Sequence, residues 1–236
     1  MPASPMPPPP RDRISGLVYL VVVLSGLFGL LYVPSCMSLA GSVHEVAARV
    51  VAHEGLFRWG IASLLVNQVA FLLLPLALLR VFHRVSLPAS ALMVALSTVS
   101  VPVALVGVGH RLDALRWLTD AAYRTGPGPD ARALAAFEAL QAARHSMLLS
   151  VLFWGLWLLP LAYLVLKSKA LPAFLGVFLA LGGLGYAVQA FGQVLVPGFS
   201  DLPWMSFVAL PATVGEIGTC LWLLLRGVPV LASPPA

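Results

Sequence analysis

Residues 59–79 read WGIASLLVNQVAFLLLPLALL, a run of 21 residues without a charge between Arg58 and Arg80. A helix needs about 20 mostly apolar residues to cross the hydrocarbon core of a bilayer. The run is too long and too apolar for a β-strand, and in lipid a backbone must satisfy its hydrogen bonds within its own segment. We therefore predict a transmembrane helix here.

Five further apolar runs have a similar length. They predict an all-α fold, a polytopic membrane bundle of about six transmembrane helices. The first run follows two arginines, which is also typical of a signal peptide, but we expect it to be retained as a helix. The runs cover residues 14–33, the segment between Arg84 and His110, and residues 146–166, 171–195 and 204–225.

Composition supports a single membrane domain. Of the 236 residues, 60% are hydrophobic and 10% are charged, against about 45–50% and about 25% in soluble domains. These values exclude a soluble enzyme, a disordered protein and a nucleic-acid-binding module, and they make the lipid bilayer the expected partner. We expect the bundle at residues 11–227, after a disordered proline-rich tail at 1–10 and before a short tail at 228–236. The oligomeric state is not determined by these features.

Two connections are long enough to hold structure of their own. Residues 34–57 contain an amphipathic stretch with valines at helical spacing. Residues 111–143 predict two short helices separated by residues 125–129, TGPGP, with Asp130 as the N-cap of the second. Prolines inside four of the spans predict kinks, and these are Pro75, Pro102, Pro160 and Pro211.

The distribution of charge predicts the orientation. The side that holds both termini has seven basic residues and one acidic residue, whereas the other side has seven of each. Basic residues in short loops near span ends favour the cytoplasmic side. We expect both termini in the cytoplasm and both long connections outside.

Glu216 is the one acidic residue inside a span. It lies ten residues before Arg226, which places it about 15 Å deep at 1.5 Å per residue. Small and weakly polar residues surround it at helical spacing, so we expect it to point into the bundle. Two readings stay open: a carboxyl that binds a ligand or couples to protons, and a neutral carboxyl that ties helices together.

Other polar side chains at membrane depth complete a candidate binding set. Asn67 and Gln68 are the expected hydrogen-bond partners of Glu216. Tyr186 and Gln189 share one face of the fifth span, nearer the outside, where they would line the mouth of a cavity. The candidate ligand-binding residues are Glu216, Asn67, Gln68, Tyr186 and Gln189; the alternative role for the amides is to join helices.

Two histidines suggest a different function. His110 ends the third span and His145 begins the fourth, both on the outer side, so a membrane enzyme or a haem redox protein is one alternative. A proton-coupled transporter is another, although no inverted repeat is visible. No catalytic motif or metal-ligand spacing occurs, and the sequence identifies no catalytic residue, metal site or cofactor.

Several short motifs are typical of one family. They include Leu152-Phe153-Trp154-Gly155, then Gly182-Gly183-Leu184-Gly185-Tyr186, and Leu210-Pro211-Ala212 followed by Gly215-Glu216. Over about residues 13–227 the chain resembles the prokaryotic membrane family catalogued as domain of unknown function 4386. The resemblance implies a multi-span topology in a prokaryotic plasma membrane and no particular reaction.

The leading hypothesis is therefore a non-enzymatic integral membrane protein of unknown role. We expect it to bind a small apolar or amphipathic molecule in an intramembrane cavity near Glu216.

Overall fold

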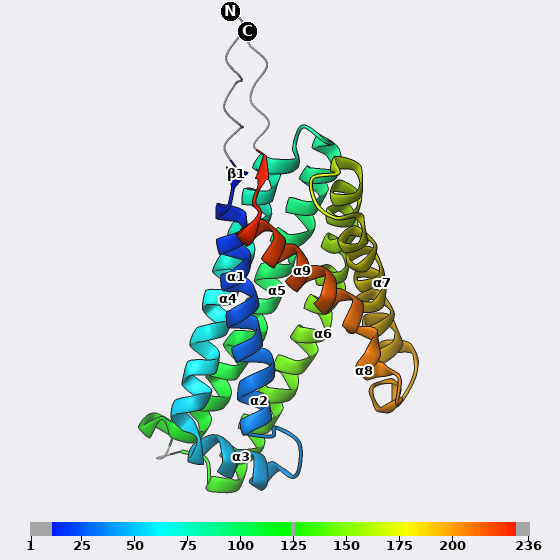
Figure 1. The fold of residues 1–236 in the computed structure, drawn as a ribbon. Helices are drawn as coiled ribbons and strands as arrows, with labels where there is room; N and C mark the ends of the chain where they lie inside the picture. The colour runs from blue at the N-terminus through cyan, green and yellow to red at the C-terminus, as the bar shows by residue number, and fades with distance from the viewer. Residues whose placement is uncertain (1–10, 124–125, 230–236) are drawn as a thin grey trace, which may run out of the picture.

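A computed structural model of the chain describes residues 11–123 and 126–229. Among these residues, five helices are long and apolar enough to cross a membrane, and a sixth apolar helix is shorter. The predicted polytopic helical bundle is therefore confirmed (Figure 1). The tail predicted at residues 1–10 lies outside the described residues, as do residues 230–236 of the second tail.

The first apolar run and the segment after it fold as four consecutive helical pieces. The run begins as an α-helix, passes through a π-helical segment and ends as a short α-helix. A separate helix then lies across the end of the bundle (Figure 1). The pieces are α1 (Ile14–Gly26), η1 (Leu27–Tyr32), α2 (Val33–Cys36) and α3 (Val43–Ala52).

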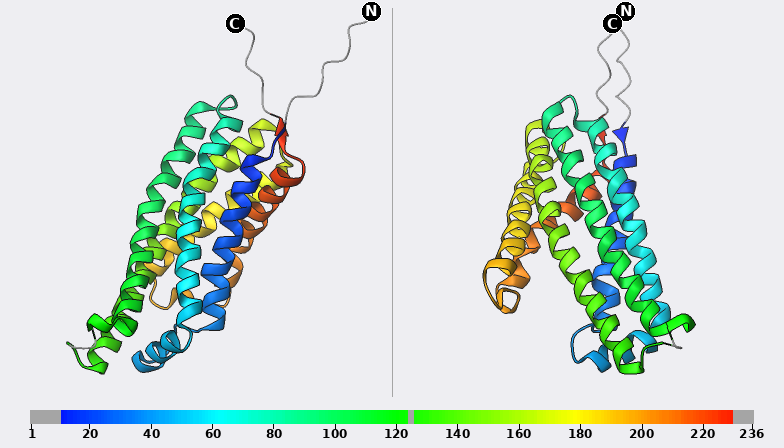
Figure 2. Two further views of the ribbon diagram at one scale, coloured as in Figure 1. Left: turned by 90° about the vertical axis from the view of Figure 1, so that its left-hand side faces the viewer. Right: turned by 180° about the vertical axis from the view of Figure 1, so that it is seen from behind.

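Four long helices and a divided sixth segment follow. The long helices run back and forth through the bundle (Figures 1 and 2), and two short 3-10 turns, η2 (Ala121–Tyr123) and η3 (Phe199–Asp201), lie in the connections. The helices are α4 (Glu54–Phe82), α5 (Leu87–Thr119), α6 (Pro129–Ser168), α7 (Ala173–Leu195), α8 (Met205–Val208) and α9 (Leu210–Leu225).

The described chain enters and leaves at the same end of the bundle. β1 (Arg11–Asp12) pairs antiparallel with β2 (Val228–Pro229). The Asp12 carboxylate, one residue before the N-cap Arg13, accepts hydrogen bonds from the Ile14 amide (2.9 Å) and the Ser15 hydroxyl (2.7 Å) at the start of α1. Because both strands lie at one end, the chain between them passes along the bundle an even number of times. The segment formed by α8 and α9 is the last of these passes.

The two short helices predicted within residues 111–143 are not separate helices. α5 continues without a break to Thr119, and α6 begins at Pro129 and runs through to Ser168. The alanine-rich start of α6 favours a helix and buries Ala136 and Leu140 against the core. The N-cap is Gly128, and Asp130 lies in the first turn instead.

The four interior prolines have two different outcomes. Pro75, Pro102 and Pro160 lie within continuous helices. Pro211 lies in the first turn of α9, directly after α8 ends, so the last segment is divided rather than kinked. Proline is well tolerated at the start of a helix because its missing N–H has no helical partner there.

Close contacts between backbones hold α9 against two neighbours. A Cβ added at Gly16 of α1 would lie 2.5 Å from the Leu224 nitrogen, and one added at Gly182 of α7 would overlap the backbone of Ala212. Small residues allow membrane helices to approach this closely. α9 therefore meets α1 near the β1 end and then diverges from it to follow α7 (Figures 1 and 2).

Candidate functional site

A cavity of about 280 Å³ opens where α1 and α9 diverge. Its walls come from both of these helices and from η1, α4, α6 and α7, and Ala209 contributes from the turn between α8 and α9. Most of the lining is aliphatic or aromatic. The polar side chains that line it are Asn67, Tyr186, Thr213 and Glu216.

Glu216 contributes the one ionisable carboxyl of this lining. It lies on α9, where it is half-buried. Within the described chain its carboxyl takes part in no hydrogen bond or ion pair, and no Lys, Arg or His lines the cavity.

Asn67 also lines the cavity, but its amide nitrogen already donates hydrogen bonds to α1. Its Nδ2 donates to the Val22 carbonyl (2.8 Å) and to the Ser25 hydroxyl (3.2 Å) of α1. Ser63 donates to the Ser25 carbonyl (2.8 Å) in the same layer. These bonds join α4 to α1 directly before the π-helical segment, where the helical hydrogen-bond register changes.

The expected hydrogen bond between Glu216 and an amide is therefore not formed. Gln68 Nε2 donates to Asn67 Oδ1 (3.1 Å), and Gln68 Oε1 is buried without a partner. The physical reason is proximity: α4 packs directly against α1, and main-chain carbonyls of α1 lie within reach of the amide. Gln68 is buried behind Asn67 and does not line the cavity.

Aromatic rings form one wall of the cavity. Phe71 of α4 meets Trp157 of α6 edge to face, with ring centroids 5.1 Å apart and an interplanar angle of 86°. Phe71 also lies 6.5 Å from the ring of Trp154. Tyr186 completes the set from α7. Such edge-to-face pairs are a preferred arrangement of aromatic side chains.

The sequence-based site and the observed cavity agree only in part. Glu216, Asn67 and Tyr186 meet in the cavity, whereas Gln189 is half-buried and does not line it. The aromatic wall was missed, although Trp154 stands in one of the family-like motifs. Trp157 follows three residues later, a spacing that places both rings on one face of a helix.

The two histidines of the alternative hypothesis do not form a site of their own. His110 Nδ1 lies 3.8 Å from Asp113 of the same helix, and His145 is exposed. No interaction joins the two rings in the part of the chain that the structure describes. The same residues contain no cluster of three or more His, Cys, Asp or Glu side chains.

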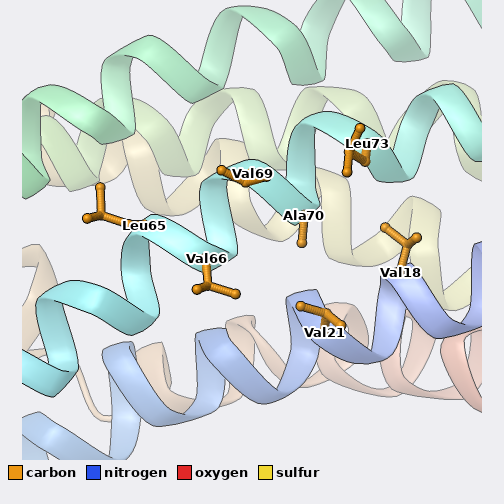
Figure 3. Close-up of a pocket in the computed structure, with 7 residues that line it drawn as sticks. All are labelled: Val18, Val21, Leu65, Val66, Val69, Ala70 and Leu73. Carbon is orange, nitrogen blue, oxygen red and sulfur yellow. The ribbon is translucent and has the colours of Figure 1, made fainter.

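A second hollow also borders α1. It is a groove of about 410 Å³ between α1 and α4. Figure 3 shows seven side chains along it, all aliphatic. They are Val18, Val21, Leu65, Val66, Val69, Ala70 and Leu73.

The family comparison covers nearly the whole bundle. The family described as domain of unknown function (DUF4386) matches residues 14–227, from the start of α1 to just beyond α9. The chain belongs to this family. The match includes every element that lines the cavity, and it confirms the resemblance drawn from the motifs. No curated protein and no solved structure matches the chain.

Proposed function

We propose that this integral membrane protein binds a small apolar or amphipathic molecule in the cavity beside Glu216. The observation that carries the proposal is a carboxyl without a partner, lining a largely apolar cavity between membrane helices. A carboxyl placed at the centre of a membrane helix costs about 2.5–3.5 kcal/mol on insertion scales. No hydrogen bond within the described protein offsets this cost, which favours a role toward a molecule from outside the chain.

The cavity also has the composition of a ligand site. Binding pockets are mostly apolar and aromatic, with a few polar groups that orient the ligand. Here Phe71, Trp154 and Trp157 supply the aromatic surface, and Glu216 supplies the polar group. Entry between α1 and α9 suits a molecule that partitions into the bilayer first.

Photolabelling in lipid nanodiscs tests the proposal. The probe is dodecanol carrying a diazirine on its chain, and peptide mass spectrometry locates the label. We expect labels on cavity residues of η1 and α9. Ala209→Phe places a ring in the cavity wall and should abolish these labels. Leu210→Phe is the matched control, because Leu210 is the next residue, is 50% exposed and does not line the cavity.

Two results would contradict the proposal. One is labelling confined to the aliphatic groove between α1 and α4. The other is labelling of the cavity that Ala209→Phe leaves unchanged, because a probe in the cavity has to compete with the new ring for space.

We propose further that both termini face the cytoplasm of a prokaryotic cell, with the protein in the plasma membrane. The support is the charge pattern: seven basic residues and one acidic residue in the sequence belong to the β1 end of the bundle. An impermeant maleimide should label Cys36, which is exposed near the opposite end, in intact cells. Cys36→Ser is the control, since Cys220 is buried. A reporter fused after Lys169 that reads as external would overturn this orientation.

A further inference from the structure

We infer that the molecule bound beside Glu216 is a lipophilic monovalent cation, an amine or quaternary ammonium with an aliphatic chain. This inference rests on the proposed function and names the ligand class of the same cavity. Glu216, the aromatic wall and the leucines of η1 each correspond to one part of such a ligand.

The charge of the cavity selects a cation. Glu216 supplies the one ionisable carboxyl of the lining, and no basic side chain lines the cavity with it. A carboxylate without a counter-ion is strongly disfavoured in a low-dielectric site, and a single positive charge beside it removes that penalty. Without a cation, the carboxyl avoids the penalty by keeping its proton. A cationic ligand can take the place of that proton, whereas an anionic or neutral ligand cannot.

The aromatic residues favour a cation that is weakly hydrated. The faces of indole, phenol and benzene rings attract ammonium groups, and quaternary ammonium ligands are commonly held by such rings. Trp154, Trp157, Phe71 and Tyr186 line the cavity together with the carboxyl. A bulky ammonium head would contact ring faces and the carboxylate at once, and it needs no hydrogen bond to either.

The size and the edge of the cavity fit a head group with a chain. Its volume of about 280 Å³ lies just below the range of about 300–1,000 Å³ that is usual for ligand pockets. Leu27, Leu30 and Leu31 of η1 line it as well, and Leu27 and Leu31 are 41% and 63% exposed. The head group would fill the cavity, and the chain would pass along these leucines toward the lipid.

A matched pair of probes tests the charge requirement. Dodecyltrimethylammonium and dodecyldimethylamine N-oxide have the same chain and similar heads, but only the first carries a net charge. Each probe competes against the diazirine-labelled dodecanol in nanodiscs of phosphatidylcholine, and cavity labelling is measured. We expect the cation to compete at a concentration at least about tenfold lower than the N-oxide on the wild type.

Two variants separate the carboxylate from the aromatic wall. Glu216→Gln should reduce the preference for the cation to within about twofold while the dodecanol still labels the cavity. Trp154→Leu should weaken competition by the cation by about threefold or more and change that of the N-oxide less. Val69→Leu, in the aliphatic groove of Figure 3, should leave both probes unchanged.

The outcomes distinguish this inference from the proposed function. Equal competition by both probes on the wild type, with the cavity still labelled, overturns the cation and leaves the proposed function in place. The absence of cavity labelling by dodecanol overturns the proposed function itself. The wild-type ratio decides the inference even where a Glu216 variant does not fold.

Discussion

Two hollows beside α1 differ in size and in chemistry. Toward α4, the groove of about 410 Å³ is lined by aliphatic side chains alone. Toward α9, the smaller cavity of about 280 Å³ contains a carboxyl, an amide and four aromatic rings. Volume alone is therefore a poor guide to a binding site in a membrane protein, because lipid chains can fill an aliphatic groove on its surface. Polar groups whose hydrogen bonds lipid cannot satisfy are a better indicator of a binding site than volume.

The packing of α1 explains why the two hollows differ. α4 lies along α1, and Ser63 and Asn67 bond to α1 carbonyls in the middle of the contact. α9 instead meets α1 closely at Gly16 and lies against α7 at Gly182. The divergence leaves the cavity between them. Four substitutions, ordered from the largest expected effect to the smallest, test this comparison.

Gly182→Ala should have the largest effect. The added methyl group would overlap the backbone of Ala212, so α7 and α9 would have to separate. We expect the free energy of unfolding to fall by about 2–3 kcal/mol, measured by thermal or denaturant unfolding in detergent. Gly109→Ala is the matched control, because nothing lies within 4 Å of its added methyl group. The control should be neutral or stabilise the helix by up to about 1 kcal/mol.

Asn67→Leu should lower the free energy of unfolding by about 1–2 kcal/mol. It removes the donor to Val22 and the acceptor for Gln68, and it leaves buried polar groups without partners. Ser63→Ala removes one hydrogen bond of the same layer and should cost about 0.6 kcal/mol. An Asn67→Leu variant as stable as the wild type would show that this layer does not hold α4 to α1.

Glu216→Leu should raise the free energy of unfolding by about 1 kcal/mol while it weakens binding of a cationic probe. The substitution replaces a half-buried carboxyl that has no hydrogen bond with an apolar side chain of similar length. Chemical unfolding and probe competition on the same preparation measure both effects. A clear loss of stability would mean that the carboxyl is a structural link between helices.

Val69→Leu should have almost no effect. Val69 is 62% exposed in the aliphatic groove, and the substitution keeps the surface apolar. We expect the free energy of unfolding to change by less than about 0.5 kcal/mol, with cavity labelling unchanged. A strong effect on binding would mean that the groove, rather than the cavity, contains the site.

Much of the fold was predictable because hydropathy is a local property. Every predicted span has a helix at its place, since uncharged runs of about 20 residues leave the backbone few alternatives in lipid. The connections were less predictable. α5 and α6 extend well past the apolar runs, because the polar and alanine-rich residues that follow still favour a helix and bury one face.

Part of the candidate site was predictable from the free-energy cost of placing a carboxyl in the membrane. Placing a carboxyl at membrane depth is energetically unfavourable, and this indicated Glu216 as a candidate site residue. Glu216 does line the cavity. The partner of Asn67 was not predictable. Its amide bonds to Val22, 45 residues away in sequence, and no local pattern indicates which carbonyl of a neighbouring helix lies within reach.

The amino-acid sequence alone determined the helical class, the positions of the apolar runs, the family and the presence of Glu216 inside a span. Each of these depends on residues close together in the chain. The tertiary structure decided that the last segment divides at Pro211 and that α9 leaves α1. It also brought Trp154, Trp157 and Glu216 to one cavity. These features depend on how closely two helix backbones approach each other. Gly16 and Gly182 allow such an approach, but the sequence does not show that their neighbours are Leu224 and Ala212 of α9.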